Sequence, residues 1–304
     1  MKLLLCTLGI LSVLSVTSQS KKPAPLQNTL LWEISGNGLK TPSYLFGTMH
    51  LLCAEDAGLS INLKKAIHDA ERIYFEIDMD DMKQMMGALK YIRMNDNTKL
   101  SDLLTEQEYT RIREYFEKHK SILPFSMMER LKPYMLTSLI SESGMGCEKT
   151  NGMEMSIMQE ANKYDKEILG LETAEYQASI FDSIPYAKQA KELLNYIDSI
   201  DRYKDNAMEL IKVYRAQDLQ KMQDMTANES GIGEYLDLLV YNRNRNWMEK
   251  LNTILKEKPT LIAVGAGHLP GEFGMIQLLR NAGFTVKPLK NTPPPPPKPA
   301  SSST

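Results

Sequence analysis

Short runs of β-forming residues lie near both ends of this chain, and a long stretch with helical patterning separates them. The runs are Thr29–Ser35, Ser43–Gly47, Arg72–Ile77, Glu167–Glu172, Thr260–Gly265 and Phe284–Leu289. This order predicts a mixed α/β (α+β) fold, in which strands from the two ends share one sheet. A large helical region, at about 80–255, is expected as an insertion over that sheet.

The first 20 residues resemble a secretory signal peptide. Lys2 precedes the apolar run Leu3–Val16, and small residues follow that run. The alternative is an anchor that is not cleaved. We expect residues 21–28 to be a linker, 29–290 to form the folded domain, and the Pro-rich residues 291–304 to be a disordered tail. The mature protein is then exported, to the periplasm or out of the cell.

Charge and hydropathy exclude two classes of partner. The formal net charge of -2 gives no indication of the basic surface on which nucleic-acid binding depends. No run after the leader reaches the roughly 18 apolar residues of a membrane span. We therefore expect no nucleic acid partner and no membrane span in the mature chain, and the oligomeric state stays open.

Two cysteines, Cys53 and Cys147, remain once the leader has been removed. In an oxidising compartment such a pair favours a disulfide. Two unconnected buried thiols are the alternative, because sequence spacing does not show that two residues are close in space.

Two of the four histidines stand in the same Gly-x-x-His frame, Gly47–His50 and Gly265–His268. Each frame ends a β-rich run and is followed by leucine, so both imidazoles could meet at one edge of the sheet. Imidazole is a good ligand for divalent transition metals, and two histidines with a carboxylate would leave open positions for water. The other two, His68 and His119, lie in charged helical stretches and are expected at the surface.

Glu76 is the best candidate for the carboxylate. It ends the apolar run "RIYFEI", and an acid in such a strand needs a partner because an unpaired buried charge is costly. A surface-facing glutamate on an edge strand is the alternative. Glu172, at the end of "EILGLE", is the second candidate. Arg243 in "YNRNRNW" could orient a substrate carbonyl, although a helical arginine is more often solvated or in a structural ion pair.

Five segments together resemble the TraB/GumN family, which includes the animal Tiki proteins. They are "YLFGTMHLL", "ERIYFEID", "GLETAEYQ", "YNRNRNW" and "LIAVGAGHLPGEFGMIQLLRNAGFTVKPL", and they occur in the order typical of the family, from about Leu31 to Leu289. The resemblance implies an α/β core with a helical insertion, and a metal-dependent peptidase supported by manganese or cobalt. Wider relatives include erythromycin-esterase-like hydrolases and haem-binding proteins of the ChaN type.

The resemblance also implies roles for individual residues. His50 and His268 would be the paired histidines, with Glu76 as the intervening acid. Arg243 and Asn244 would be the Arg-Asn element, and Glu154 stands where the family places an acid after a glycine.

We therefore expect an exported hydrolase, most consistent with a peptidase that acts on peptide or protein substrates. A divalent transition metal (Mn, Co or Zn) on His50, His268 and Glu76 would activate water. Two alternatives stay open: a metal-independent His/Glu hydrolase on the same fold, and a non-enzymatic protein that binds haem or another small ligand. The histidines could also merely cap strands in an exported domain.

Overall fold

A six-stranded mixed sheet forms the centre of the fold, in the strand order β6-β4-β7-β2-β1-β8. Its strands are β1 (Leu31–Ser35), β2 (Ser43–Thr48), β4 (Arg72–Ile77), β6 (Glu167–Glu172), β7 (Thr260–Gly265) and β8 (Thr285–Pro288). β7 pairs in parallel with both β2 and β4, and β1 runs antiparallel to its neighbours β2 and β8. The expected sharing of one sheet by strands from both ends of the chain is thus confirmed, and the mixed α/β class with it.

The computed structural model describes residues 26–119, 123–145, 147, 149–228 and 233–294. The predicted signal peptide, most of the predicted linker and most of the Pro-rich tail lie outside these residues. The limits of the 29–290 domain and of the insertion at about 80–255 stay predictions.

Helices make up most of the remainder. They are α1 (Ile61–Asp69), α2 (Met82–Ala88), α3 (Leu100–Leu103), α4 (Glu106–Lys118), α5 (Phe125–Met128), α6 (Pro133–Ser143), α7 (Met153–Asn162), α8 (Ala174–Ile180), α9 (Tyr186–Asp198), α10 (Ile200–Arg215), α11 (Leu219–Ala227), α12 (Asn242–Glu257) and α13 (Met275–Asn281). Among the described residues, none of these helices is both long and apolar enough to cross a membrane.

Local sequence explains several element boundaries. The Ser60 hydroxyl accepts a hydrogen bond from Leu63 N and begins α1, while Thr105 and Glu108 form a reciprocal capping box at α4. Pro133 occupies the first turn of α6, where a missing N–H costs nothing. The β1–β2 loop uses Gly36 and Gly38 at positive φ, a conformation that glycine adopts without steric cost.

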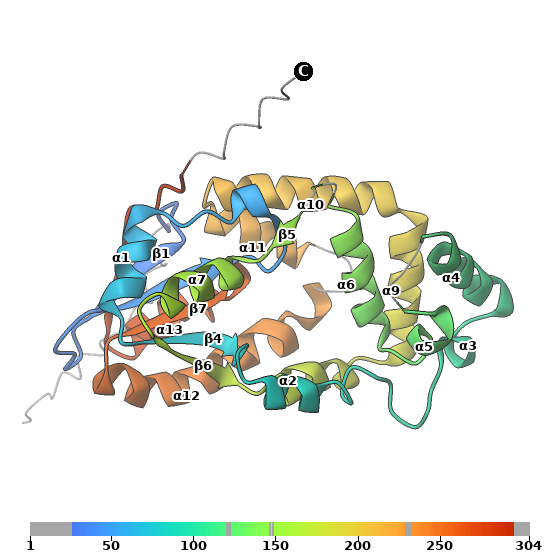
Figure 1. Cartoon of the computed structure of the whole chain (residues 1–304), viewed down its shortest axis with the longest axis horizontal. Helices are drawn as coiled ribbons and strands as arrows, with labels where there is room; N and C mark the ends of the chain where they lie inside the picture. Colours follow the sequence, from blue (N-terminus) through green and yellow to red (C-terminus); the bar gives the residue numbers. More distant parts are fainter. Residues whose placement is uncertain (1–25, 120–122, 146, 148, 229–232, 295–304) are drawn as a thin grey trace, which may run out of the picture.

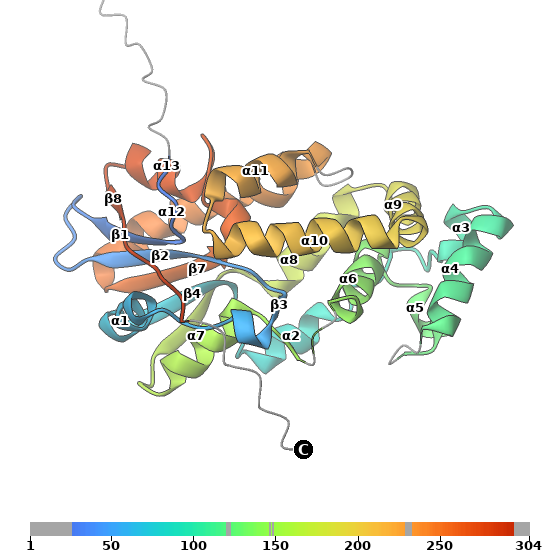
Figure 2. The ribbon, with the colours of Figure 1, turned by 90° about the horizontal axis from the view of Figure 1, so that it is seen from above.

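Two hydrophobic cores hold the molecule together. The larger core lies around the sheet, with α1 and α7 on one side and α11, α12 and α13 on the other (Figure 2). The smaller core is built from residues of α3, α4, α5, α6 and α9, away from the sheet. Figure 1 shows α10 running from the sheet region to these outer helices.

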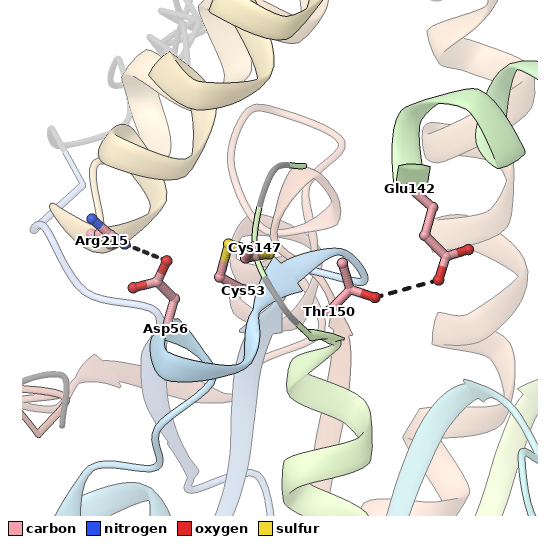
Figure 3. The surroundings of a disulfide bond; sticks show 6 residues. All are labelled: Cys53, Asp56, Glu142, Cys147, Thr150 and Arg215. Atoms are coloured by element: carbon pink, nitrogen blue, oxygen red, sulfur yellow. Dashed lines mark hydrogen bonds and ion pairs between the residues drawn. A yellow bond between two sulfur atoms is a disulfide. The ribbon is translucent and has the colours of Figure 1, made fainter. Parts of the chain in front are cut away.

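A second, two-stranded sheet pairs β3 (Leu52–Cys53) with β5 (Thr150–Asn151). Cys53 and Cys147 are joined by a disulfide beside this pair, with 5.8 Å between their Cα atoms (Figure 3). The disulfide that the sequence left open is therefore present, and it links the segment after β2 to the segment before α7.

Candidate active site

The carboxyl ends of four parallel strands bring the candidate residues to one edge of the sheet. Glu76 belongs to β4, Glu172 ends β6, and His50 follows the end of β2. His268 closes the 3₁₀ turn that follows β7. Because β2 and β7 are neighbours, with Thr48 opposite Gly265, the two Gly-x-x-His frames lie side by side.

The two glycines of these frames serve different purposes. A Cβ atom at Gly47 would lie 3.1 Å from the Cα and Cβ atoms of Ala266, so glycine lets the turn that carries His268 pack against β2. A Cβ atom at Gly265 would lie 3.1 Å from Glu76 Oε1 and 3.8 Å from His50 Nε2. Glycine at this second position leaves open the space between the acid and the two imidazoles.

Arg243, from the first turn of α12, binds both strand-end acids. Its Nε donates to Glu172 Oε1 at 2.9 Å, and its Nη2 pairs with both Glu172 and Glu76 Oε2. Its pKa is raised, because the charges of Glu76 and Glu172 outweigh the effect of burial. The side chain is 8 % exposed, so of the two alternatives expected for a helical arginine it is not solvated but lies in ion pairs, with Glu76 and Glu172.

His268 is held as a neutral ring in one tautomer. Asn244 uses its amide nitrogen to donate to the carbonyls of His268 and Phe273, so its Oδ1 accepts a hydrogen bond from His268 Nδ1–H at 2.7 Å. The lone pair of Nε2 then faces Arg243 Nη1, at 3.1 Å. Burial lowers the pKa of His268 to about 3, and the charges of Arg243 and His50 act in the same direction. We conclude that Nε2 is an acceptor at neutral pH.

His50 pairs with a second acid, Glu154 of α7. Its Nδ1 lies 2.6 Å from Glu154 Oε1, and its Nε2 lies 3.9 Å from Glu76 Oε1. Desolvation opposes protonation, but the hydrogen bond and charge of Glu154 and the charge of Glu76 raise the pKa of His50 to about 9. Because 67 % of the side chain is exposed, solvent also screens its pairing with Glu154. His50 is therefore the member of the site that faces incoming molecules.

Glu76 lies between the two histidines. Its Oε1 accepts from Gly265 N at 2.8 Å and is 3.7 Å from His268 Nε2. Burial alone would raise the pKa of Glu76, but the guanidinium of Arg243 and the protonated imidazole of His50 hold it well below its usual range. Glu76 is thus a permanent carboxylate over the ordinary pH range.

The donor types are those that bind divalent transition metals, but they are not arranged around an ion in this structure. Two imidazole Nε2 atoms face Glu76 Oε1, and acceptors on both Nδ1 atoms orient the rings as second-shell groups do around metals. Glycine at position 265 keeps the space beside Glu76 Oε1 free of a side chain. In the described part of the chain, however, no three His, Cys, Asp or Glu side chains stand at metal-binding positions. Arg243, itself a cation, contacts both His268 Nε2 and Glu76.

The site opens into a cleft of about 750 Å³ between the sheet edge and the outer helices. His50, Glu76 and Arg243 line it on the sheet side, and Tyr134 of α6 and Glu192 of α9 line it on the helical side. A cleft of this size accepts an extended peptide or a drug-sized molecule.

Two residues of the site were not predicted. Gln177 of α8 donates to Glu76 Oε2 at 2.9 Å and to Glu172 Oε1 at 3.3 Å. Trp247 donates to Glu172 Oε2 at 2.9 Å, and the Arg243 guanidinium lies over its ring at 4.8 Å from the centroid. Trp247 is four residues after Arg243 on the same helix face, a spacing that would have suggested a common site.

Comparison with known proteins gives a family and several relatives named metalloprotease TIKI. Residues 30–288 match the model of the TraB/PrgY/gumN family. "Metalloprotease TIKI2" of Xenopus tropicalis is 22 % identical over 86 % of this chain and 60 % of that protein. "Metalloprotease TIKI homolog" of Amphimedon queenslandica is 25 % identical over 88 % of this chain and 62 % of its own length.

A bacterial relative, "Uncharacterized protein YbaP" of Shigella flexneri, is 23 % identical over 78 % of this chain and 88 % of that protein. The chain thus spans about three fifths of the length of the two TIKI relatives, but most of the bacterial one. No solved structure matches it. On the match to residues 30–288, this chain belongs to the TraB/PrgY/gumN family.

Proposed function

We propose that this protein is an exported hydrolase that cleaves peptide bonds of polypeptides bound in the cleft of about 750 Å³. The observation that carries the proposal is the convergence of His50 Nε2, Glu76 Oε1 and His268 Nε2 around the space that Gly265 leaves open. The names of the TIKI relatives support peptide hydrolysis, and the Cys53–Cys147 disulfide supports export.

His50 and Glu76 are the residues that would hold a divalent transition metal, with His268 as a third candidate, whose Nε2 contacts Arg243 Nη1 in this structure. When bound, such an ion would polarise the scissile carbonyl and lower the pKa of a bound water. The residues around it have separate tasks. Glu154 and Asn244 orient the two rings, and Arg243 holds Glu76 and Glu172 in place.

A metal-independent route on the same site is the second candidate. Arg243 already supplies positive charge to Glu76 and His268, and Glu154 with His50 forms an acid–imidazole pair facing the cleft. In this route His50 acts only in its deprotonated form, in which it accepts a proton from water and returns it to the leaving amine, with Glu154 stabilising the imidazolium. Because the pKa of His50 is about 9, hydrolysis by this route should rise with pH toward that value. The haem-binding alternative has less support, because both Nε2 atoms face Glu76 Oε1 and both Nδ1 atoms have partners, so neither ring directs a free nitrogen away from the site.

Metal content and peptide hydrolysis should be measured together on the mature protein, purified without a tag or chelator. The matched variants are His50→Ala and the surface variant His68→Ala, whose ring lies outside the cleft. We expect near-stoichiometric metal, and hydrolysis that falls about 100-fold or more in His50→Ala and stays unchanged in His68→Ala.

Hydrolysis that survives thorough chelation would select the metal-independent route. No hydrolysis of any protein or peptide mixture, with or without added manganese, cobalt or zinc, would contradict the proposed function.

A further inference from the structure

Two cavities meet at the candidate catalytic residues. One is the cleft of about 750 Å³, and the other is a smaller cavity of about 300 Å³. The residues that line both are His50, Glu76 and Gln177. A chain that passes from one cavity to the other therefore crosses the site at the point where these three side chains lie.

The smaller cavity has an apolar lining. Phe75 and Ile77 from β4, Met79 just after β4 and Met155 from the first turn of α7 contribute its walls. Its polar groups are those of the site itself, together with the neighbouring Glu154. A cavity of this size lies at the lower limit for ligand pockets, so it suits one large side chain better than a whole small molecule.

The two methionines indicate which side chains this cavity would hold. Met79 is half-buried and Met155 is 37 % exposed, so neither is locked in the core. Methionine is unbranched and flexible, and surfaces that contain it adapt to apolar partners of different shape. The occupant best matched to such walls is a leucine, methionine or phenylalanine side chain.

We propose that the cavity formed by Phe75, Ile77, Met79 and Met155 is the specificity subsite for an apolar side chain next to the scissile bond. The inference rests on the proposed function and deepens it, because it names the substrate class. Substrates are polypeptides with a large apolar residue at the cleavage site, and the remainder of the bound segment lies in the larger cleft under α6 and α9. Discrimination against a small or charged residue comes from the apolar contacts that only a large side chain makes.

The test uses a series of peptides that differ at one position, with leucine, methionine, alanine, aspartate or lysine there. For wild-type mature protein we expect kcat/KM to be about 100-fold higher for leucine or methionine than for alanine, the order found for hydrophobic pockets. Aspartate peptides should be cut more slowly than alanine peptides.

Two variants and a control connect that preference to the cavity. Met155→Trp fills the cavity, and the leucine-to-alanine ratio of kcat/KM should fall at least 10-fold. Met79→Asp places a charge in its wall, and preference should move from leucine toward lysine. Met86→Trp is the control, because Met86 is 63 % exposed on α2 and lines neither cavity, so the ratio should stay at the wild-type value.

The outcomes separate the two proposals. Peptides that are cut without an apolar preference, or a preference that survives both cavity variants in folded protein, would overturn the subsite alone. If wild-type protein cuts no peptide in the series or in a digest of unrelated proteins, the proposed function fails and the subsite with it.

Discussion

A side chain at position 265 would enter the space between Glu76 Oε1 and His50 Nε2. Because the residue there is glycine, this space stays open for a reacting species. We expect Gly265→Ala to lower peptide hydrolysis and metal uptake at least 10-fold, because the new methyl group would lie 3.1 Å from Glu76 Oε1. Unfolding temperature should change little, since no backbone atom is among the three nearest neighbours of that methyl group. Activity assays and metal analysis measure the expected losses, and a thermal unfolding scan measures the unfolding temperature.

Gly267→Ala is the matched control in the same turn, because a Cβ atom there meets nothing within 4 Å. Equal activity of the two variants would contradict the role given to the space at Gly265.

The acid–imidazole pair of Glu154 and His50 makes the metal-free protein sensitive to pH. Since the folded-state pKa of His50 is raised from 6.5 to about 9, its contribution to stability is complete below about pH 6.5 and is lost as pH rises through 9. After allowance for the exposure of the ring, that contribution is about 1 kcal/mol. Chemical denaturation of metal-free protein at pH 6 and pH 9.5 should show the loss.

Removing the charge of Glu154 tests whether this acid is the cause of the raised pKa of His50. In Glu154→Gln the His50 titration, followed by NMR of the ring protons, should move down toward 6.5. Glu142→Gln, at an exposed acid of the same cleft, should leave it in place. An unchanged midpoint in Glu154→Gln would show that another group sets the pKa of His50.

The residues of the site differ in how far they were predictable. His50, Glu76 and His268 could be selected because each stands at or just after the end of a β-rich run, where parallel sheets place their ligands. The contacts of Glu154 with His50 and of Gln177 with Glu76 could not be derived in this way. They join segments that are far apart in sequence, and no local pattern encodes which helices meet.

At the scale of the elements, the small sheet of β3 and β5 and the Cys53–Cys147 disulfide beside it support the candidate site. His50 lies three residues before Cys53, and Met153 N donates to Met49 O beside the same pair of strands. The link thus holds the His50 segment against the start of α7, which carries Glu154. Figure 3 shows two further contacts near it, an Asp56–Arg215 ion pair and a hydrogen bond from Thr150 to Glu142.

Reduction of the disulfide should therefore lower both stability and activity. In the chain-entropy model, closing a loop of this length stabilises a protein by about 4–5 kcal/mol, so we expect the unfolding temperature to fall by about 10–20 °C. Peptide hydrolysis should fall as well, because the His50–Glu154 contact loses its support. Thermal scans with and without reductant measure the first effect.

The Cys53→Ser/Cys147→Ser variant serves as control, since reductant should not affect it. If the wild-type protein unfolds at the same temperature in both conditions, the link adds nothing to stability.

The type and limits of each helix or strand were easier to predict than which strands pair with each other. The strand ends at Ser35, Ile77 and Glu172 and the capping box at Thr105 follow from residues within a few positions of each other. The insertion of β7 between β2 and β4 depends on pairing over about 200 residues, which no local preference determines.

For the molecule as a whole, the separation into two hydrophobic cores predicts uneven stability. The smaller core of α3, α4, α5, α6 and α9 should open at lower free energy than the sheet, because it buries fewer apolar side chains. Hydrogen exchange should therefore be faster at the amides of α4, α6 and α9 than at those of β2, β4 and β7.

Leu136→Ala, in the smaller core, should cost about 2–5 kcal/mol locally and speed exchange in those helices while the strands stay protected. Leu45→Ala, in β2 at the larger core, should speed exchange throughout. Uniform acceleration in both variants would show that the two cores unfold as one unit.

The position of β7 also determines when the site can exist during synthesis. The ribosome synthesises His50 and Glu76 early, but it adds Arg243, Gly265 and His268 only after most of the polypeptide has been made. Until β7 arrives, β2 and β4 have no shared neighbour, and the sheet consists of two unconnected halves. A nascent chain therefore carries the N-terminal residues of the candidate site without the residues that complete it until translation is nearly finished.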